Sequence, residues 1–283
     1  MIFLASLVLE GGSFRGIFSA GVMDGFLELG IEFPYVIGVS AGMGNAAAYL
    51  SKQKGRNIEL MKAYRNDPRY FGIHHFLTDR SIFGVEFVFE TIPQELVPFD
   101  YETFRNYPGK VYGVVTNAET GKAEYLDVLS QSKHSEVFKA TCSIPGLFEG
   151  ELINGVRYFD GGVADSIPIV KAMNDGNSKH VIVLTQPEGY VKEFDIKTQM
   201  IAMYMGEQYP NLAYRLSKRA DMYNLQLALC NKLEEEGKAF IIRPSHPLNS
   251  LEDSIEHLEM TYEEGKQWVL DHKDELLAFI QED

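Results

Sequence analysis

The sequence contains little cysteine, and no stretch of it is apolar for long. Cys142 and Cys230 are the only cysteines among the 283 residues. Two cysteines are too few for a disulfide framework, and their spacing is not that of a metal site. A reduced, intracellular setting is therefore expected, with a cytoplasmic location. No segment approaches the roughly 20 apolar residues of a membrane-spanning helix.

Basic residues are also in short supply. The chain has 26 Lys and Arg against 40 Asp and Glu, which gives a formal net charge of −14. This balance argues against nucleic acid as a partner and against electrostatic adhesion to anionic membranes. An acidic protein can still take a lipid, provided that it meets the membrane or micelle transiently through apolar surface. Nothing in the sequence indicates the oligomeric state.

The sequence has no internal repeat, no low-complexity segment and no linker rich in Pro, Gly or Ser. Residues 1–283 are therefore expected to form a single domain. The apolar residues 1–9 lack a basic residue near their start, and Glu10 and a glycine-rich turn follow where a cleavage site would be needed. They predict a buried parallel strand and not a targeting signal.

The pattern of apolar residues predicts an α/β protein. A helix over 17–29 and a strand over 35–37 complete one βαβ unit with the first strand, which indicates a parallel sheet. The fold class expected is a three-layer α/β/α sandwich with a mostly parallel central sheet. Further strands are expected over 110–117, 123–128, 151–153, 156–159, 180–185 and 239–243. Further helices are expected over 45–50, 132–142, 167–173 with Ser166 as its cap, 197–236 with a break at Pro210, and 250–280 as a helical tail with a solvated face.

Aromatic residues are dense between Asn66 and Phe104, a segment that also contains three prolines. One interpretation is a cap or lid over an apolar pocket. The other is that these aromatic side chains fill the main core. The sequence does not decide between them.

A serine lies on a turn between the strand that ends near Ile37 and the helix that follows. Residues 38–42 read Gly-Val-Ser-Ala-Gly and match the pattern G-x-S-x-G. In such a turn the strained backbone exposes the serine oxygen, here that of Ser40, and Gly38 and Gly42 leave room for the turn. The alternative is an ordinary small-residue turn between a strand and a helix.

Two other loops follow predicted strands. Residues 11–16 read Gly-Gly-Ser-Phe-Arg-Gly, and residues 160–162 read Asp-Gly-Gly. Ligands gather at the carboxyl ends of strands in open α/β sheets. A nucleophile, backbone N–H donors and a base are the parts that ester hydrolysis needs. Taken alone, the aspartate would be read as a turn residue after a strand.

The base in such an enzyme is usually a histidine. A Ser-Asp-His triad is the alternative arrangement, with His246 or His257 as its last member. Against it, Ser40 follows only two strands, whereas the serine of an α/β-hydrolase follows several. No histidine lies in a loop that other signals single out, so packing or surface roles are favoured for them.

Three motifs together resemble those of one family. Residues 10–16, residues 38–42 and residues 160–162, in this order, are similar to the motifs of the bacterial patatin-like phospholipases. Residues 140–146 (ATCSIPG) and 165–168 (DSIP), on either side of the aspartate, extend the resemblance. It covers about the first two thirds of the chain and ends near Gln186.

The resemblance implies a serine lipid acyl hydrolase with a two-residue catalytic dyad, acting on a lipid or acyl ester without metal or cofactor. Ser40 would be the nucleophile and Asp160 the base, which must be partly buried and in direct contact with the serine to be basic enough. The oxyanion hole would comprise Gly11, Gly12 and Ser13. The implied supporting residues are Arg15, Gly16, Gly38, Gly42, Gly161 and Gly162.

The chain departs from the family pattern at Ser13, which stands where a glycine is usual. Serine keeps the N–H donor but disfavours a left-handed backbone. Arg15 is expected to brace the loop or to meet an anionic head group. A dinucleotide-binding glycine loop is the rival interpretation of this turn, but Glu28 and Glu32 lie on the wrong elements for it.

Two other functions remain open at this stage. A weakened site would make the chain a lipid-binding or regulatory protein, and Ser13 motivates that reading. An acyltransferase would share the first chemical steps and pass the acyl group to an alcohol in place of water.

Overall fold

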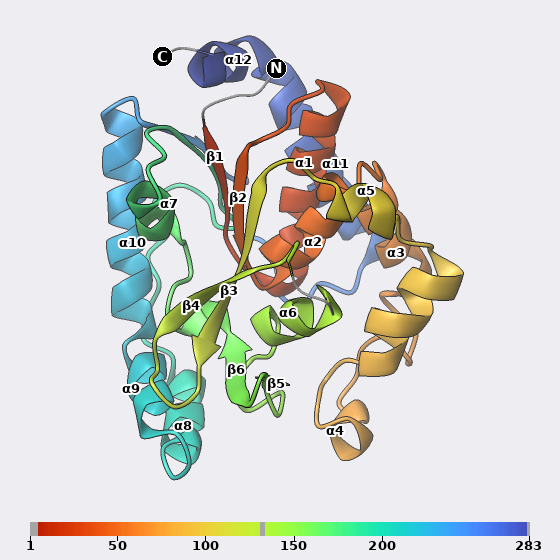
Figure 1. Ribbon diagram of the computed structural model, residues 1–283, viewed down its shortest axis with the longest axis vertical. Coiled ribbons are helices and arrows are strands. Elements are labelled where there is room, and N and C mark those ends of the chain that lie inside the picture. The colour runs from red at the N-terminus through yellow and green to blue at the C-terminus, as the bar shows by residue number, and fades with distance from the viewer. Residues whose placement is uncertain (1–4, 131–133, 282–283) are drawn as a thin grey trace.

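The computed structural model describes residues 5–130 and 134–281. They form an eight-stranded mixed sheet between two layers of helices, which confirms the expected fold class (Figure 1). The strands are β1 Ser6–Leu9, β2 Tyr35–Val39, β3 Lys110–Asn117, β4 Ala123–Asp127, β5 Glu151–Ile153, β6 Val156–Asp160, β7 His180–Val183 and β8 Ala239–Ile242. The predicted strand over residues 1–9 is confirmed from Ser6, and residues 1–4 lie outside the described ranges.

Helices connect the strands, except within the β3-β4 and β5-β6 hairpins, which the sequence predicted. They are α1 Gly16–Glu28, α2 Ala41–Leu50, α3 Arg56–Tyr64, α4 His75–Thr78, α5 Tyr101–Arg105, α6 His134–Thr141, α7 Ile169–Asn174, α8 Ile196–Met205, α9 Pro210–Ser217, α10 Arg219–Glu235, α11 Ile255–Asp271 and α12 Lys273–Gln281. Two short 3-10 helices are η1 Ser13–Arg15 and η3 Gly161–Val163, and a π-helix is η2 Phe87–Leu96. Part of the predicted helix over 132–142 lies outside the described residues.

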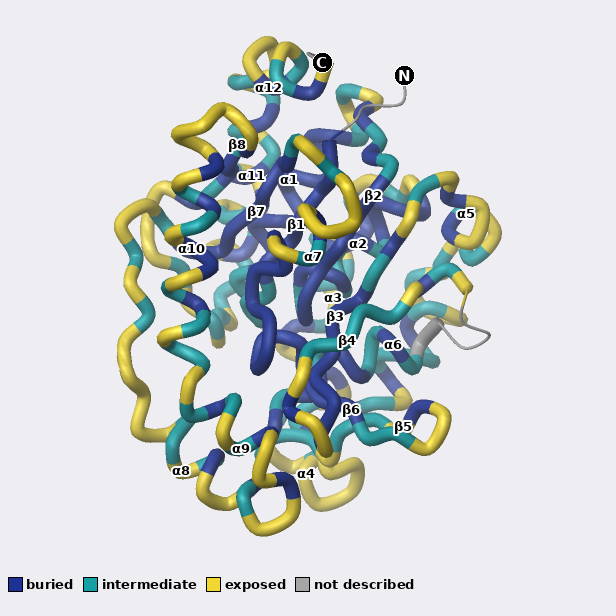
Figure 2. Tube along the Cα trace, turned by 60° about the vertical axis from the view of Figure 1, so that its left-hand side comes forward, coloured by how far each residue is buried: buried dark blue, intermediate teal, exposed yellow. Residues whose placement is uncertain are grey.

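Five strands are parallel and form the centre of the sheet, in the order β3-β2-β1-β7-β8. Side chains alternate between the two faces of a strand, and β1 shows this directly. Leu7 and Leu9 pack with α1 and α2, while Val8 packs with α7 and α10 on the other face. Burial on both faces explains why Leu7, Val8 and Leu9 of β1 are apolar in succession, and Figure 2 shows the central strands as the most buried part of the chain.

Near the carboxyl terminus of the chain, helix α11 packs closely against α1. The sequence predicted a helical tail with a solvated face over 250–280, and α11 has such a face. The other face packs against α1 through Leu258, Tyr262 and Val269. Glycines on both helices let the backbones approach: a Cβ added at Gly21 would lie 1.9 Å from the Tyr262 carbonyl oxygen.

The structure differs from two local expectations. Ser166 does not cap the helix that follows, since its hydroxyl donates to the carbonyl of Gly162 and the helix begins later, at Ile169. The helical stretch over 197–236 is broken near Pro210, as predicted, but also at Lys218. Within the described ranges, no helix is both long enough and apolar enough to cross a membrane.

Candidate active site

The edge of β3 brings two distant residues together. Along residues 112–116 one edge of β3 pairs with β4, so the other edge takes both β2 and β6, one after the other. Val39 of β2 is the partner of Val114, and Asp160 of β6 is the partner of Val115. Because β2 and β6 run in opposite directions, their carboxyl ends meet. Ser40 and Asp160 therefore lie next to each other although 120 positions separate them.

Ser40 occupies the turn between β2 and α2 that the pentapeptide predicted. Its backbone has φ of 52° and ψ of −127°, a conformation that non-glycine residues rarely adopt. The turn requires a glycine two residues later, because a Cβ at Gly42 would lie 2.5 Å from the Glu10 carbonyl oxygen. Gly38, two residues before, is the fourth residue of β2. Only 9% of Ser40 is exposed.

Asp160 is the last residue of β6 and is 6% exposed. One carboxylate oxygen accepts a hydrogen bond of 2.7 Å from the N–H of Gly162. Burial raises the pKa of Asp160, and hydrogen bonds from the Ser40 side chain and the Gly162 amide, with the charge of Arg219, oppose that rise. The result is a carboxylate more basic than one in water and in contact with the serine hydroxyl. Gly161 is required here, because a Cβ would lie 2.3 Å from the Val114 carbonyl oxygen.

The segment 140–143 fixes both residues, a role that the sequence alone did not reveal. The Ser40 N–H donates to the Thr141 hydroxyl at 2.9 Å, and that hydroxyl donates to the Val114 carbonyl at 2.6 Å. The Asp160 N–H donates to the carbonyl of Ser143 at 2.9 Å. The only signal in the sequence was that this segment belongs to one of the motifs.

The glycine-rich loop lies against Ser40. Gly11, Gly12 and Ser13 line the same cavity as Ser40 and Asp160, and a Cβ at Gly11 would be 3.0 Å from the Ser40 Cβ. Among the described residues, no acceptor is paired with the N–H groups of these three residues. Ser13 has φ of 51°, so the left-handed backbone that a glycine would favour is adopted by a serine. The loop thus presents donors beside the nucleophile.

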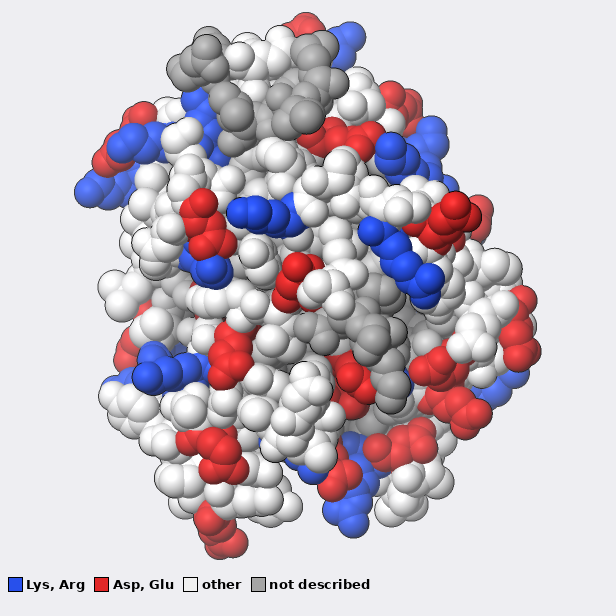
Figure 3. Space-filling model, viewed as in Figure 1, with Lys and Arg blue, Asp and Glu red and all other residues white. Residues whose placement is uncertain are grey.

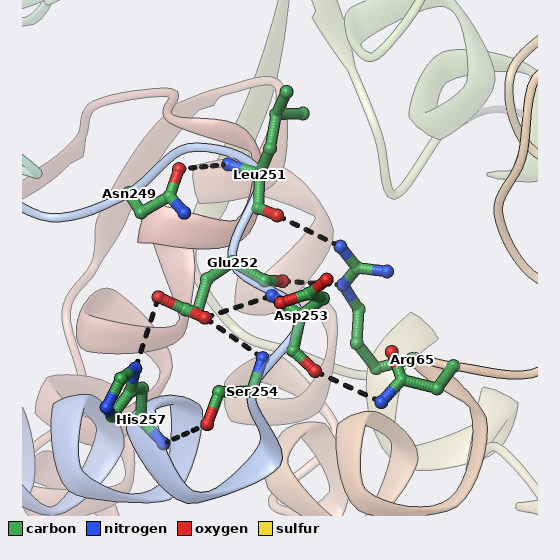
Figure 4. Close-up of polar contacts among 8 residues, drawn as sticks. Arg65, Asn249, Leu251, Glu252, Asp253, Ser254 and His257 are labelled. Atoms are coloured by element: carbon green, nitrogen blue, oxygen red, sulfur yellow. Dashed lines mark hydrogen bonds and ion pairs between the residues drawn. The ribbon is translucent and has the colours of Figure 1, made fainter.

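Contacts from far along the chain brace this loop. The N–H of Phe14 donates to the carbonyl of Ser250, and the guanidinium of Arg65 lies over the Phe14 ring, 4.0 Å from its centroid. Figure 4 shows Arg65 donating to the carbonyls of Leu251 and Glu252 as well. At the other end of the loop, the carbonyl of Gly16 accepts a hydrogen bond from Asn45 of α2.

Ser40 lies at the boundary of two cavities of different character. A polar cavity of about 290 Å³ contains Ser40, Asp160 and the glycine loop, together with Arg15, Lys192 and Arg219. An apolar cavity of about 260 Å³ extends from Ser40 in the other direction. Aromatic residues of the segment 66–104 line the apolar cavity, namely Tyr70, Phe83, Phe89, Phe99 and Tyr101. Phe104 of the same segment lies in the main core, so each interpretation of these aromatics holds for some of them.

The histidines considered for a triad lie elsewhere. His246 is paired with Glu264 and His257 with Glu252, and both line a separate surface cavity. In the part of the chain that the structure describes, no histidine lines either cavity beside Ser40. The described residues also contain no group of three or more His, Cys, Asp or Glu placed to hold a metal ion.

Lys192 and Arg219 are cavity residues that sequence reasoning missed. Both lie beyond Gln186, where no motif was found, and only the fold brings them to the carboxyl ends of the strands. Arg15 was expected near the site, and it lines the polar cavity.

Comparisons with known proteins agree with this architecture. Residues 7–173 match the family model of the patatin-like phospholipases, and residues 209–281 match a domain of unknown function, DUF6363. The uncharacterized protein YjjU of Escherichia coli is 27% identical over 186 residues, which is 64% of this chain and 52% of that protein. The chain thus spans about half the length of this curated relative.

The solved structure of VipD from Legionella pneumophila has a similar fold. It matches 96% of this chain and 67% of its own, with a TM-score of 0.50 and 14% sequence identity. At that identity the likeness concerns the fold alone. The family match, in contrast, covers more than half of the sequence and all three motifs. The chain therefore belongs to the patatin-like phospholipases, a family of lipid acyl hydrolases.

Proposed function

We propose that the protein is a serine lipid acyl hydrolase of the phospholipase A, lysophospholipase or carboxylesterase type. The Ser40 oxygen attacks the ester carbonyl carbon, and its proton passes to the Asp160 carboxylate. The N–H groups of Gly11, Gly12 and Ser13 stabilise the oxyanion that forms. The leaving alcohol takes the proton from Asp160, and a water molecule, deprotonated by Asp160, then cleaves the acyl-enzyme.

The observation that carries the proposal is that Ser40 and the buried Asp160, whose pKa is raised by burial, lie at the facing ends of β2 and β6 and line one cavity. An ordinary aspartate, with a pKa of about 3.9, is a poor base for a hydroxyl. Burial and direct contact remove much of that disadvantage. The absence of a histidine from the described walls of both cavities favours a dyad over a triad.

The apolar cavity provides the place for the acyl chain. It is lined by Ser40 and largely by aromatic and aliphatic side chains, which come from the cap segment and from α2, α3 and α6 among other elements. In this proposal both matched regions form a single active site, because residues of both line the polar cavity next to the apolar cavity.

The test is hydrolysis of p-nitrophenyl butyrate by two variants. Ser40→Ala and Asp160→Asn should each lower kcat by about three orders of magnitude or more, since each removes one half of the catalytic pair. Circular dichroism and thermal unfolding check that both variants fold. His246→Ala and His257→Ala are the controls and should retain activity. Full activity in Asp160→Asn together with its loss in either histidine variant would overturn the dyad.

The pH profile gives a second readout of Asp160. Only the ionised carboxylate can accept a proton, and burial raises its pKa. The acid limb of kcat/KM should therefore have its midpoint above the value of about 4 expected for a free aspartate. A limb at or below that value contradicts the role of Asp160 as base.

A protein that binds lipids without hydrolysing them is the alternative that Ser13 favours. A fluorophosphonate probe distinguishes the two, because it labels only an activated serine. Labelling of wild-type protein but not of Ser40→Ala supports the enzyme, whereas no labelling of the folded wild type supports the alternative. Product analysis with a competing alcohol separates hydrolysis from acyl transfer.

A further inference from the structure

Three cationic side chains converge on the polar cavity of a strongly acidic protein. Arg15 comes from η1, Lys192 from the loop after β7, and Arg219 is the first residue of α10. The net charge of the chain is −14, and Figure 3 shows basic and acidic side chains interspersed over the face that it draws. A cluster of three cations beside the nucleophile is thus a local exception to the charge of the molecule.

These cations have no carboxylate partner of their own. Arg219 donates from Nε to the neutral carbonyl of Gly162 at 2.7 Å, and the Lys192 ammonium lies 5.2 Å from the centroid of the Tyr223 ring. The Nε of Arg15 is buried and has no hydrogen-bond partner among the described residues. None of the three forms an ion pair within the described ranges. All three residues are partly buried, where a charge is stabilised by an opposite one, so this arrangement points to a missing anion.

The acidic groups nearby form their hydrogen bonds elsewhere, although Glu10 interacts through its charge with Arg15 and Lys192, and Asp160 with Arg219. Glu10 is buried, accepts hydrogen bonds from the Thr185 N–H and the Tyr223 hydroxyl, and has a pKa raised by burial. Asp160 is engaged with Ser40. Burial, followed by the charges of Arg219 and Arg15, lowers the pKa of Lys192 to about 8, against the weaker opposing effect of Glu10 and Asp195. Crowded cations of this kind are stabilised by a bound anion.

The position of Ser40 indicates which anion. A phospholipid has its acyl chain on one side of the ester bond and its phosphate on the other. Ser40 likewise has an apolar cavity on one side and the cationic cavity on the other. With the acyl chain in the apolar cavity, the phosphate would reach the three cations.

We propose that the polar cavity is a head-group site for phospholipids of net negative charge, with Arg15, Lys192 and Arg219 as the residues that bind the phosphate. This specificity rests on the proposed acyl hydrolase function. A zwitterionic choline head group would bring a second, positive charge to the same cations and is disfavoured. A neutral ester would leave them unpaired.

The site also gives a role to the region that matches a domain of unknown function. Arg219 and Tyr223 belong to residues 209–281. Arg15, in contrast, belongs to the region that matches the patatin-like family. The head-group site therefore lies across the two matched regions: α10 contributes Arg219, and Lys192 comes from the segment between the regions.

The experiment compares two substrates with the same oleoyl chain in mixed detergent micelles, lysophosphatidate and lysophosphatidylcholine. The quantity measured is the ratio of their kcat/KM values. It should be about ten or more in favour of the anionic lipid in wild-type protein. Lys192→Gln and Arg219→Gln should each lower the ratio about tenfold, because each removes a charge-assisted hydrogen bond. Lys218→Gln, at the exposed neighbour of Arg219, should leave the ratio as it is.

A binding measurement keeps this test separate from that of the proposed function. Glycerol 3-phosphate should raise the Tm of Ser40→Ala protein, and the shift should disappear when Lys192→Gln is added. Sodium sulfate at equal ionic strength is the control for unspecific anion binding. A wild-type enzyme that cleaves p-nitrophenyl butyrate but shows a substrate ratio near one overturns the head-group site alone. A wild type without any esterase activity overturns the hydrolase, while a Tm shift specific to glycerol 3-phosphate would still support the anion site.

Discussion

At the scale of single residues, the geometry of the candidate site depends on one buried hydroxyl. Thr141 is fully buried, accepts a hydrogen bond from the N–H of Ser40 and donates one to the carbonyl of Val114. It thereby links the strained turn to the central strand β3 and holds the Ser40 backbone in a conformation that non-glycine residues avoid. Thr141 contacts no reacting atom, so we regard it as a positioning residue.

Thr141→Val should reduce both stability and activity. The valine leaves the Ser40 N–H and the Val114 carbonyl buried and unpaired, at a cost of about 1–3 kcal/mol for each group. Urea denaturation should therefore show a loss of several kcal/mol in the free energy of unfolding, and kcat should fall with KM nearly unchanged. Thr141→Ser keeps the hydroxyl and should restore most of kcat. Equal kcat in the valine and serine variants would contradict the positioning role.

Ser13 answers a question that the sequence left open. A serine in a left-handed backbone costs roughly 1–2 kcal/mol relative to glycine. The structure places Ser13 in that conformation, beside a loop held by Phe14, Arg65 and Ser250. Ser13 thus adopts the conformation that a glycine would favour, within a loop that its neighbours hold in place.

At the scale of elements, the contact between α1 and α11 was the least predictable part of the fold. The charged residues of α11 indicated a solvated face, but the close approach on its other face depends on glycines, which carry no apolar signal in the sequence. A Cβ at Gly265 would lie 2.3 Å from the Phe18 carbonyl oxygen, and one at Gly25 would lie 2.8 Å from the Val269 Cβ. The two helices are therefore closer than ordinary side chains would permit.

Gly21→Ala should destabilise the protein by several kcal/mol, because its Cβ would overlap the Tyr262 carbonyl and force α11 away. Gly44→Ala is a matched control in α2, since a Cβ there meets nothing within 4 Å. Alanine is a better helix former than glycine, so the free energy of unfolding of the Gly44→Ala control should rise by about 0.5–1 kcal/mol. Chemical denaturation of both variants measures the difference. Similar stability in both would mean that α1 and α11 are less closely packed than the structure shows.

Strands and motifs were predictable because each carries its signal locally. The strand over 110–117 has the predicted limits, and the strand over 180–185 ends two residues early. The Asn154-Gly155 turn joins β5 to β6 with positive φ at both residues, as its sequence indicated. The positions of Ser40 and Asp160 beside each other rested on the family resemblance, because the shared edge of β3 is a non-local feature. Lys192 and Arg219 had no local signal at all.

At the scale of the whole molecule, large apolar side chains are exposed on two elements at one end. Leu77 of α4 is 90% exposed and Met203 of α8 is 79% exposed, and both elements lie at the same end of the long axis in Figures 1 and 2. Other exposed apolar residues near them are Ile73, Phe76, Phe194, Ile196, Met200 and Tyr204. The inner side of α8 contributes Thr198 and Ile201 to the polar cavity. We propose that this end contacts the lipid surface from which the substrate enters.

Leu77→Asp and Met203→Asp should each lower the rate on phospholipid vesicles relative to the rate on p-nitrophenyl butyrate by about tenfold. A charge in place of an apolar side chain removes roughly 1.5–3 kcal/mol of favourable burial at the lipid surface. Vesicle co-sedimentation of the same variants checks binding directly. Met260→Asp, at an exposed apolar residue of α11, is the control and should leave the ratio unchanged. An equal loss in all three variants argues against a surface confined to α4 and α8.

The pairing of α1 with α11 also has a consequence for biosynthesis. The glycine face of α1 leaves the ribosome more than 200 residues before α11, which ends at Asp271. At a synthesis rate of about 5–20 residues per second, roughly ten to fifty seconds pass between the synthesis of α1 and that of α11. During that interval the apolar side chains of α1 that α11 later covers are open to other chains, so we expect nascent protein to depend on chaperones more than its size alone suggests.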